Sequence, residues 1–424
     1  MTFYIYTLGC KVNAYESNYV KESLLKASYK LGEEDNSDIY IINTCSVTNT
    51  ADNKSLKVIR SVVKNHKDSL IIVMGCLPQV RYDDVYNIDG VDIVIGNKNK
   101  SKVLEEIENY KKNGKTKQLF DIAKTEFENM KLDNFDKTRA FVKIQDGCNN
   151  FCSYCIIPYT RGGIRSKDPS VVLEEIKCLV KNGHQEIVLT GIHTGHYITK
   201  THDLTDLIRE ISKIKGLSRI RISSIEITEL NDKFLEELGN NKLLVDHLHI
   251  PLQSGCDKTL REMNRKYDIN YFKNKINTIR SIRNDISITT DVIVGFPNET
   301  EEDFKETLKN IKEINFSKIH VFPYSRRKNT KADLMDNQVD EVVKKQRVKE
   351  LIELSKELEI NYFKKFINKE VVFIPEVIKD GYIQGHTGNY LLVKTLGNNE
   401  DLNKETKALI KEVNYPYVIG DKIN

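Results

Sequence analysis

The chain has 424 residues, which is too long for one ordinary hydrophobic core and predicts two to four domains of roughly 100–200 residues each. Charged residues make up 30% of it, and a formal net charge of +4 permits an RNA partner without demonstrating one. No apolar run of about 18 residues and no basic, apolar leader is found, so we expect a cytoplasmic protein with no membrane partner. Eight cysteines in such a protein are typical of metal binding or catalysis rather than of disulfides.

The first 115 residues alternate short apolar runs with helical periods. This pattern predicts an open parallel sheet with helices on both faces, in which ligands bind beyond the carboxyl ends of the strands. A polar stretch, 116–137, is expected to be a linker. The strands are expected at 3–8, 39–43, 70–74 and 92–95, and the helices at 15–27, 52–65, 82–87 and 100–111.

Three cysteines follow these predicted strands. Cys10, Cys45 and Cys76 each lie one or two residues past a strand's carboxyl end, so a parallel sheet would bring them to one rim. One interpretation is a shared metal group, and the other is three buried core cysteines, which are common in proteins.

A second alternating series occupies residues 138–330. Six βα units over this length fall short of a full eightfold barrel and predict a partial (β/α)6 barrel, so the fold class is α/β. Its strands are expected at 141–145, 187–190, 220–224, 247–252, 288–294 and 318–322, and its helices at 170–181, 204–214, 232–238, 258–263, 269–283 and 300–314.

The last part of the chain changes character. A charged helical pattern over 339–366 predicts a connecting helix, so we assign 331–363 to a linker helix. From 364 to 424, short β-like runs separated by Gly and Asn predict a small β-barrel. These runs are 371–377, 382–385, 390–394, 408–413 and 421–423.

Cys148, Cys152 and Cys155 have the spacing C-x3-C-x2-C. A cubane iron–sulfur cluster normally takes four Cys ligands, so a trio this compact leaves one iron free to bind something other than protein. The alternative is a structural zinc site, but zinc sites usually close with four N or S ligands and no second C-x-x-C or H-x3-H pair is present.

With its flanks, 142–147 and 156–163, this motif resembles the methylthiotransferase branch of the radical S-adenosylmethionine (SAM) family. Within that branch it is nearest to enzymes acting on threonylcarbamoyladenosine in tRNA. The resemblance extends over nearly the whole chain, since 9–13, 43–48 and 75–76 match further family motifs. It implies two [4Fe–4S] clusters, one on Cys148, Cys152 and Cys155 that binds SAM and an auxiliary one on Cys10, Cys45 and Cys76. It also implies that the C-terminal barrel is like a TRAM domain, a small RNA-binding module.

The resemblance further implies contacts with SAM and with substrate. Arg161 and Arg165 flank the cluster loop, and Arg326 and Arg327 follow the last barrel strand. We expect them to bind phosphate groups or a carboxylate, the alternative being solvated surface charges. The expected SAM contacts are Tyr154, Thr190, Gly191, Ser223, Glu226, Gln253, Val294 and Gly295.

The function implied is transfer of a methylthio group to C2 of N6-threonylcarbamoyladenosine beside the anticodon (position 37), by a radical SAM mechanism. The implied partners are the tRNA anticodon loop and a low-potential electron donor of the flavodoxin or ferredoxin type. Gly163 and Ile164 stand where isopentenyladenosine enzymes tend to carry two Glu, which suits a substrate with an extra carboxylate. Three alternatives stay open: an isopentenyladenosine enzyme, a ribosomal-protein aspartate methylthiotransferase and a non-catalytic Fe–S RNA-binding protein.

Overall fold

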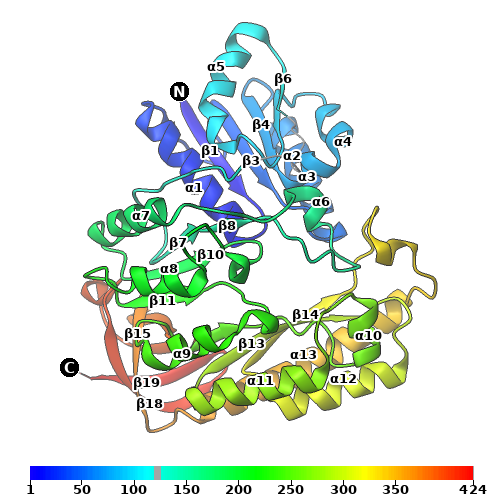
Figure 1. The fold of residues 1–424 in the computed structure, drawn as a ribbon. Coiled ribbons are helices and arrows are strands. Elements are labelled where there is room, and N and C mark those ends of the chain that lie inside the picture. Colours follow the sequence, from blue (N-terminus) through cyan, green and yellow to red (C-terminus); the bar gives the residue numbers. More distant parts are fainter. Residues whose placement is uncertain (119–125, 424) are drawn as a thin grey trace.

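The computed structural model describes residues 1–118 and 126–423. These residues form three parts that follow one another in the sequence: an N-terminal sheet, a central barrel and a small C-terminal barrel (Figure 1). The N-terminal sheet lies over the carboxyl ends of the central barrel strands, and the C-terminal barrel packs at their amino ends. Within the described residues, no helix is both long enough and apolar enough to cross a membrane.

The N-terminal part is a six-stranded parallel sheet in the order β2-β1-β3-β4-β5-β6. Its central strand β3 is buried at every residue, as expected for a parallel strand covered on both faces. The strands are β1 Thr2–Thr7, β2 Lys30–Leu31, β3 Ile39–Thr44, β4 Leu70–Gly75, β5 Ile93–Ile95 and β6 Thr116–Gln118. The helices are α1 Lys11–Lys26, α2 Asn49–Asn65, α3 Cys76–Val80, α4 Tyr82–Tyr86 and α5 Val103–Asn113.

The segment expected to be a linker is more ordered than its polar composition indicates. β6 pairs with β5 and extends the sheet beyond residue 115. Met130, Leu132 and Phe135 are buried in the core of the central barrel. Only residues 119–125 of this segment lie outside the described residues.

The predicted partial barrel is confirmed. Six parallel strands run in chain order as two three-stranded sheets, joined by a bridge between Ile220 and Leu244. The strands are β7 Arg139–Lys143, β10 Glu186–Thr190, β11 Arg219–Ile222, β12 His247–His249, β13 Ser287–Val294 and β14 Lys318–Pro323. The helices are α7 Pro169–Lys181, α8 Leu204–Ile211, α9 Asp232–Asn240, α10 Asp257–Glu262, α11 Ile269–Ile282 and α12 Glu301–Ile314. The cluster loop adds β8 Gln145–Asp146, α6 Ile157–Arg161 and β9 Arg165–Ser166.

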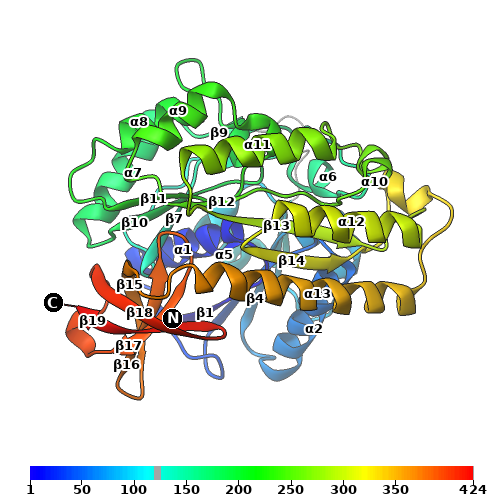
Figure 2. The same cartoon turned by 90° about the horizontal axis from the view of Figure 1, so that it is seen from below.

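The connecting helix α13 Glu341–Lys364 covers the open edge of the barrel beside β14 (Figure 2). Its Ser355 hydroxyl accepts a hydrogen bond from the Ile319 backbone at 3.0 Å. The small β-barrel that follows is also confirmed, with closed order β15-β16-β17-β19-β18. Its strands are β15 Glu370–Lys379, β16 Tyr382–Thr387, β17 Leu392–Leu396, β18 Thr406–Asn414 and β19 Tyr417–Ile423.

Candidate active site

Cys10, Cys45 and Cys76 come from the carboxyl ends of three adjacent strands, β1, β3 and β4. The Asn13 amide ties the first two loops together, donating to the carbonyls of Leu8 at 2.7 Å and Thr44 at 2.9 Å. The parallel sheet therefore gathers the three thiols to one rim, as expected for its strand order.

Close backbone packing sets the positions of these cysteines. Gly9 has φ +97°, and a Cβ there would lie 2.8 Å from the Cys45 sulfur. Gly75 has φ +110°, and a Cβ there would lie 2.6 Å from the Thr44 carbonyl oxygen. Only glycine fits both requirements, a left-handed conformation and a close approach.

Cys148, Cys152 and Cys155 lie on one loop after β8. The loop is tied to the residues that follow it by a 3.0 Å hydrogen bond from the Cys148 backbone to the Gly162 carbonyl. It closes on itself through a second one, also 3.0 Å, from the Cys155 backbone to the Cys152 carbonyl. Burial raises the pKa of the Cys155 thiol to about 12.

Both trios line a single cavity of about 940 Å³, which runs from the carboxyl ends of the barrel strands to their amino ends. All six cysteines are free thiols, so each trio offers three sulfur ligands. Burial raises the pKa of Cys45 to about 11, and the neighbouring Cys76 adds to the shift. A bound metal must displace the protons of such thiols. Three thiols and an open cavity fit a cluster with one iron free of protein.

The cavity is also lined by six of the residues expected to contact SAM. These are Tyr154, Thr190, Gly191, Ser223, Glu226 and Gln253. All of them except Tyr154 lie at, or within four residues beyond, the ends of β10, β11 and β12, as a ligand site on a barrel requires. Gln253 has φ +69° and Thr190 ends β10.

Val294 and Gly295 are not among the residues that line the cavity, so their contact with SAM stays a prediction. Val294 is fully buried. Gly295, with φ +70°, packs beneath the helix α13, where a Cβ would lie 2.3 Å from Cγ of Lys344. Its missing side chain therefore serves the packing of α13, a contact that no local sequence pattern reveals.

Sequence reasoning missed Arg265. This residue pairs with Glu226 and also donates to the Cys152 sulfur at 3.5 Å. Burial alone would lower the pKa of Arg265. The nearby tyrosines and Glu226 outweigh burial, so the pKa lies well above its usual value. The cation therefore stays charged beside a sulfur ligand. Its only signal in the sequence is a basic residue in a loop, which is not specific.

A second missed contact involves His193, which lies 3.5 Å from the Cys148 sulfur through Nδ1. Its Nε2 pairs with Glu229, and Glu229 also lies 3.0 Å from Nε2 of His196. Burial alone would lower the pKa of His193, but its contacts with Cys148 and Glu229 outweigh burial and raise the pKa to about 10. Glu229 thus orients an imidazole toward the cluster loop.

Arg161 lines the cavity, and its expected contact with phosphate or carboxylate stays a prediction. It is fully buried, and its guanidinium pairs with Glu16 of α1 at 3.1 Å and with Asp146 at 3.3 Å. Glu16 also pairs with Lys100 and, at 2.8 Å, with Lys143. The buried network joins the N-terminal sheet to the barrel, and the Arg161 charge lies close enough to affect the pKa of Cys45.

The other expected phosphate-binding residues divide into two groups. Arg327 is buried and pairs with Asp52 of α2 at 2.8 Å, so it holds the N-terminal part against the barrel and is not a free phosphate ligand. Arg326 is exposed and pairs with Asp333 at 2.6 Å. Arg165 is partly buried and donates to the Arg161 carbonyl at 2.7 Å.

Two family models match the chain. Residues 142–311 match the radical SAM superfamily, and residues 2–96 match a family described as uncharacterized protein family UPF0004. The first match includes the loop with Cys148, and the second includes all three N-terminal cysteines. The threonylcarbamoyladenosine tRNA methylthiotransferase MtaB of Bacillus subtilis is 42% identical over 99% of this chain and 96% of its own length. The chain belongs to the radical SAM methylthiotransferase family.

Other relatives in this family have two different names. MtaB of Thermotoga maritima is 38% identical over 94% of this chain and 92% of its own length. The tRNA-2-methylthio-N(6)-dimethylallyladenosine synthase of Clostridium tetani is 35% identical over 95% of this chain and 92% of its own length. The radical SAM methyltransferase TsrM of Kitasatospora setae has a similar fold, with a TM-score of 0.57 at 11% identity over 78% of this chain and 76% of TsrM.

Proposed function

We propose that this enzyme adds a methylthio group to C2 of N6-threonylcarbamoyladenosine next to the tRNA anticodon. The observation that carries the proposal is that the two cysteine trios line one cavity, from opposite domains. A sulfur group held at one trio and a reactive species generated at the other would then share a single chamber. The names of the most similar relatives support the choice of nucleoside.

The residues present fit two [4Fe–4S] clusters, one on each trio, and SAM between them. These groups supply the one-electron chemistry that an unactivated C–H bond requires and that acid–base side chains do not provide. The protein's own contribution is to bind and orient the reactants and to exclude water.

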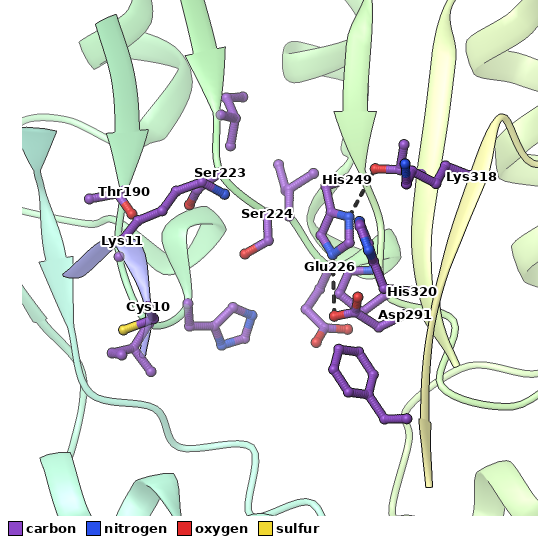
Figure 3. Close-up of a pocket in the computed structure, with 18 of the residues that line it drawn as sticks. Cys10, Lys11, Thr190, Ser223, Ser224, Glu226, His249, Asp291, Lys318 and His320 are labelled. Atoms are coloured by element: carbon purple, nitrogen blue, oxygen red, sulfur yellow. Dashed lines mark hydrogen bonds and ion pairs between the residues drawn. The ribbon is translucent and has the colours of Figure 1, made fainter. Parts of the chain in front are cut away.

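Polar groups around the late trio are arranged to orient SAM. Thr190 and Ser223 present hydroxyls at strand ends, and Glu226 presents a carboxylate held by Arg265 (Figure 3). Carboxylate and hydroxyl oxygens accept hydrogen bonds from ribose hydroxyls and from an ammonium group. Tyr154, next to Cys155, packs against the apolar cluster that contains Met263 and Phe296 and also lines the cavity, where an aromatic ring would suit adenine.

The two flanking domains line the cavity at its two ends. The N-terminal sheet contributes Cys10, Lys11 and Cys45 at one end, and the C-terminal barrel contributes His386 and Tyr390 at the other. These walls restrict the access of water and oxygen to reactive species. The target base must leave the anticodon-loop stack to enter. A low-potential donor of the flavodoxin or ferredoxin type would supply electrons to the cluster.

The test is mass spectrometry of tRNA nucleosides from two strains. One lacks the gene for this protein, and in the other the gene has been restored. We expect the 2-methylthio-N6-threonylcarbamoyl nucleoside to disappear and to return on complementation. Its persistence refutes the preferred substrate. Loss of the isopentenyl counterpart, or of the methylthioaspartate in ribosomal protein, would identify one of the two enzymatic alternatives.

A second assay addresses the non-catalytic alternative. The reconstituted protein is incubated without oxygen with SAM and dithionite, and 5′-deoxyadenosine is measured by liquid chromatography. We expect it to form. Its absence in a protein with full iron content would favour a binding protein with structural clusters.

A further inference from the structure

Lys11 is an unpaired cation inside the cavity. It is the first residue of α1, directly after Cys10, and it lines the same space as both trios. In Figure 3 its side chain extends from the Cys10 loop, past Thr190, toward the strand ends that carry Ser223 and Ser224. It is half-buried, and no residue of the described structure forms an ion pair or hydrogen bond with its ammonium group.

The other Lys and Arg side chains lining the cavity all have acidic partners. Arg161 pairs with Glu16, Arg265 with Glu226, and Lys318 with Glu359 at 2.9 Å. These pairs leave Lys11 as the one lining Lys or Arg without a carboxylate partner among the described residues.

The acidic groups of the cavity wall are likewise engaged. Besides Glu226 and Glu359, the wall includes Asp291, which lies 3.3 Å from Nε2 of His249 (Figure 3). None of these three carboxylates pairs with Lys11, so its ammonium group has no direct partner among the described residues. A cation without a direct partner in a partly desolvated cavity favours an anionic ligand.

The surroundings of Lys11 define where such an anion would lie. Its charge lies close enough to His247 on β12 and His320 on β14 to contribute to lowering their pKa, for which burial is the largest cause. Both imidazoles are therefore neutral at physiological pH and offer hydrogen bonds without adding positive charge. A carboxylate flanked by neutral polar groups matches these surroundings.

We propose that Lys11 binds the carboxylate of the threonyl group on the substrate nucleoside and so selects threonylcarbamoyladenosine over uncharged N6-substituents. The inference rests on the proposed function. SAM also carries a carboxylate, and the Lys11 side chain extends toward Ser223, an expected SAM contact (Figure 3). The backbone of Lys11 directly follows Cys10 of the early trio, which favours the substrate, and the SAM affinities of Lys11 variants separate the two ligands. An isopentenyl group has no charge. Its binding would remove water from the Lys11 ammonium group without providing a partner, which costs free energy.

The experiment compares reconstituted holoenzymes: wild type, Lys11→Gln, Lys11→Arg and the control Lys177→Gln on the exposed face of α7. Two synthetic anticodon stem-loops are used, identical except that the threonyl carboxylate is free in one and a methyl ester in the other. The dissociation constants of both stem-loops are measured by fluorescence anisotropy, that of SAM by equilibrium dialysis, and the methylthiolation rates by mass spectrometry. Iron and sulfide contents verify that the clusters are intact.

We expect the wild type and Lys177→Gln to prefer the free acid by about tenfold, the size of a typical charge-assisted hydrogen bond. Lys11→Gln should bind both stem-loops equally, and Lys11→Arg should restore most of the preference. SAM binding should be unchanged in every variant.

Three outcomes would overturn this role. A Lys11→Gln enzyme that keeps the preference for the free acid shows that another group reads the carboxylate. A loss of SAM affinity with unchanged stem-loop preference assigns Lys11 to the carboxylate of SAM. A wild type that methylthiolates neither stem-loop refutes the proposed function itself, whereas product formation with an unaltered preference in Lys11→Gln refutes only the role of Lys11.

Discussion

The two cysteine trios reach the same cavity by different structural routes. Cys148, Cys152 and Cys155 lie within eight residues on one loop, so chain connectivity alone keeps them together. Cys10, Cys45 and Cys76 are brought together only when β1, β3 and β4 pair in register. The early trio therefore depends on the folded sheet, whereas the spacing of the late trio is a property of the local sequence.

Their electrostatic environments also differ. Near the late trio, Arg265 donates directly to a cysteine sulfur and His193 lies within reach of another. Near the early trio, the Arg161 charge acts from a buried ion network that joins two domains. Hydrogen bonds to sulfur and nearby charges both influence the potential of a cluster, so the two clusters are expected to differ in potential.

The largest expected effect is that of Cys148→Ala. Losing one of three ligands should prevent the late cluster from forming, so SAM cleavage and methylthio transfer should both stop. Iron content should fall from about eight to about four atoms per chain. Cys178→Ala on α7, away from the cavity, serves as the control and should retain both clusters. Deoxyadenosine production by Cys148→Ala at the wild-type rate would disprove the assignment.

Cys76→Ala should separate the functions of the two trios. Iron should again fall to about four atoms, but the late cluster remains and should still cleave SAM. Deoxyadenosine should therefore form without any methylthiolated product, as measured by chromatography of one reaction mixture. Retained product formation would show that the early trio is not needed for transfer, which contradicts the two-cluster mechanism.

The contrast between the trios explains what the sequence could predict. The late trio is visible from its spacing alone, and the early trio becomes visible once parallel strands are inferred from alternating apolar runs. The barrel strands are predictable for the same reason, because short runs with buried apolar residues alternate with helical periods. The segment 126–137 is not, because a few buried residues such as Met130 and Leu132 are separated by polar ones.

Charged residues were the least predictable part of the site. Arg161 and Arg327 look like surface cations in the sequence, yet both are buried against acids more than a hundred residues away. Arg265 was missed for the same reason, since its partner Glu226 belongs to another strand end. Ion pairing between distant segments has no local sequence pattern, so it can be found only from the folded chain.

The buried ion network that joins the N-terminal sheet to the barrel can be broken at Glu16. Burial would raise the pKa of Glu16, but Arg161, Lys100 and Lys143 outweigh it and hold the pKa well below its usual value. Glu16→Gln leaves these buried cations without their shared carboxylate and should lower the free energy of unfolding by ~3–5 kcal/mol. Urea unfolding measures this, with Glu174→Gln as a control, because its ion pair with Lys131 is largely exposed and contributes less than ~1 kcal/mol. Equal midpoints for the two variants would contradict the role of Glu16.

A smaller effect is expected from Gly9→Ala. The new Cβ would strain a backbone with φ +97° and displace the Cys45 side chain, so the early cluster should be incompletely loaded. Gly147→Ala is the matched variant before the late trio, where φ is +76° and the Cβ would meet the Gly163 carbonyl. Iron content and deoxyadenosine yield distinguish them: Gly9→Ala should spare SAM cleavage and Gly147→Ala should impair it. The reverse pattern would mean that the glycines do not set the positions of their adjacent cysteines.

The smallest expected effect separates two neighbouring arginines. Arg326 is 58% exposed and paired only at the surface, so Arg326→Gln should weaken tRNA binding a few-fold and reduce the salt dependence of log Kd by about one.

Arg327→Gln should leave the salt dependence unchanged, because its guanidinium is buried against Asp52 and meets no phosphate. It should instead lower the free energy of unfolding by ~1–3 kcal/mol, because the buried Asp52 at the contact between α2 and the barrel would lose its partner. Filter binding over a series of salt concentrations, together with thermal unfolding, tests both. If Arg327→Gln altered the salt dependence and Arg326→Gln did not, the phosphate contact would belong to Arg327, and the assignment of Arg326 would be wrong.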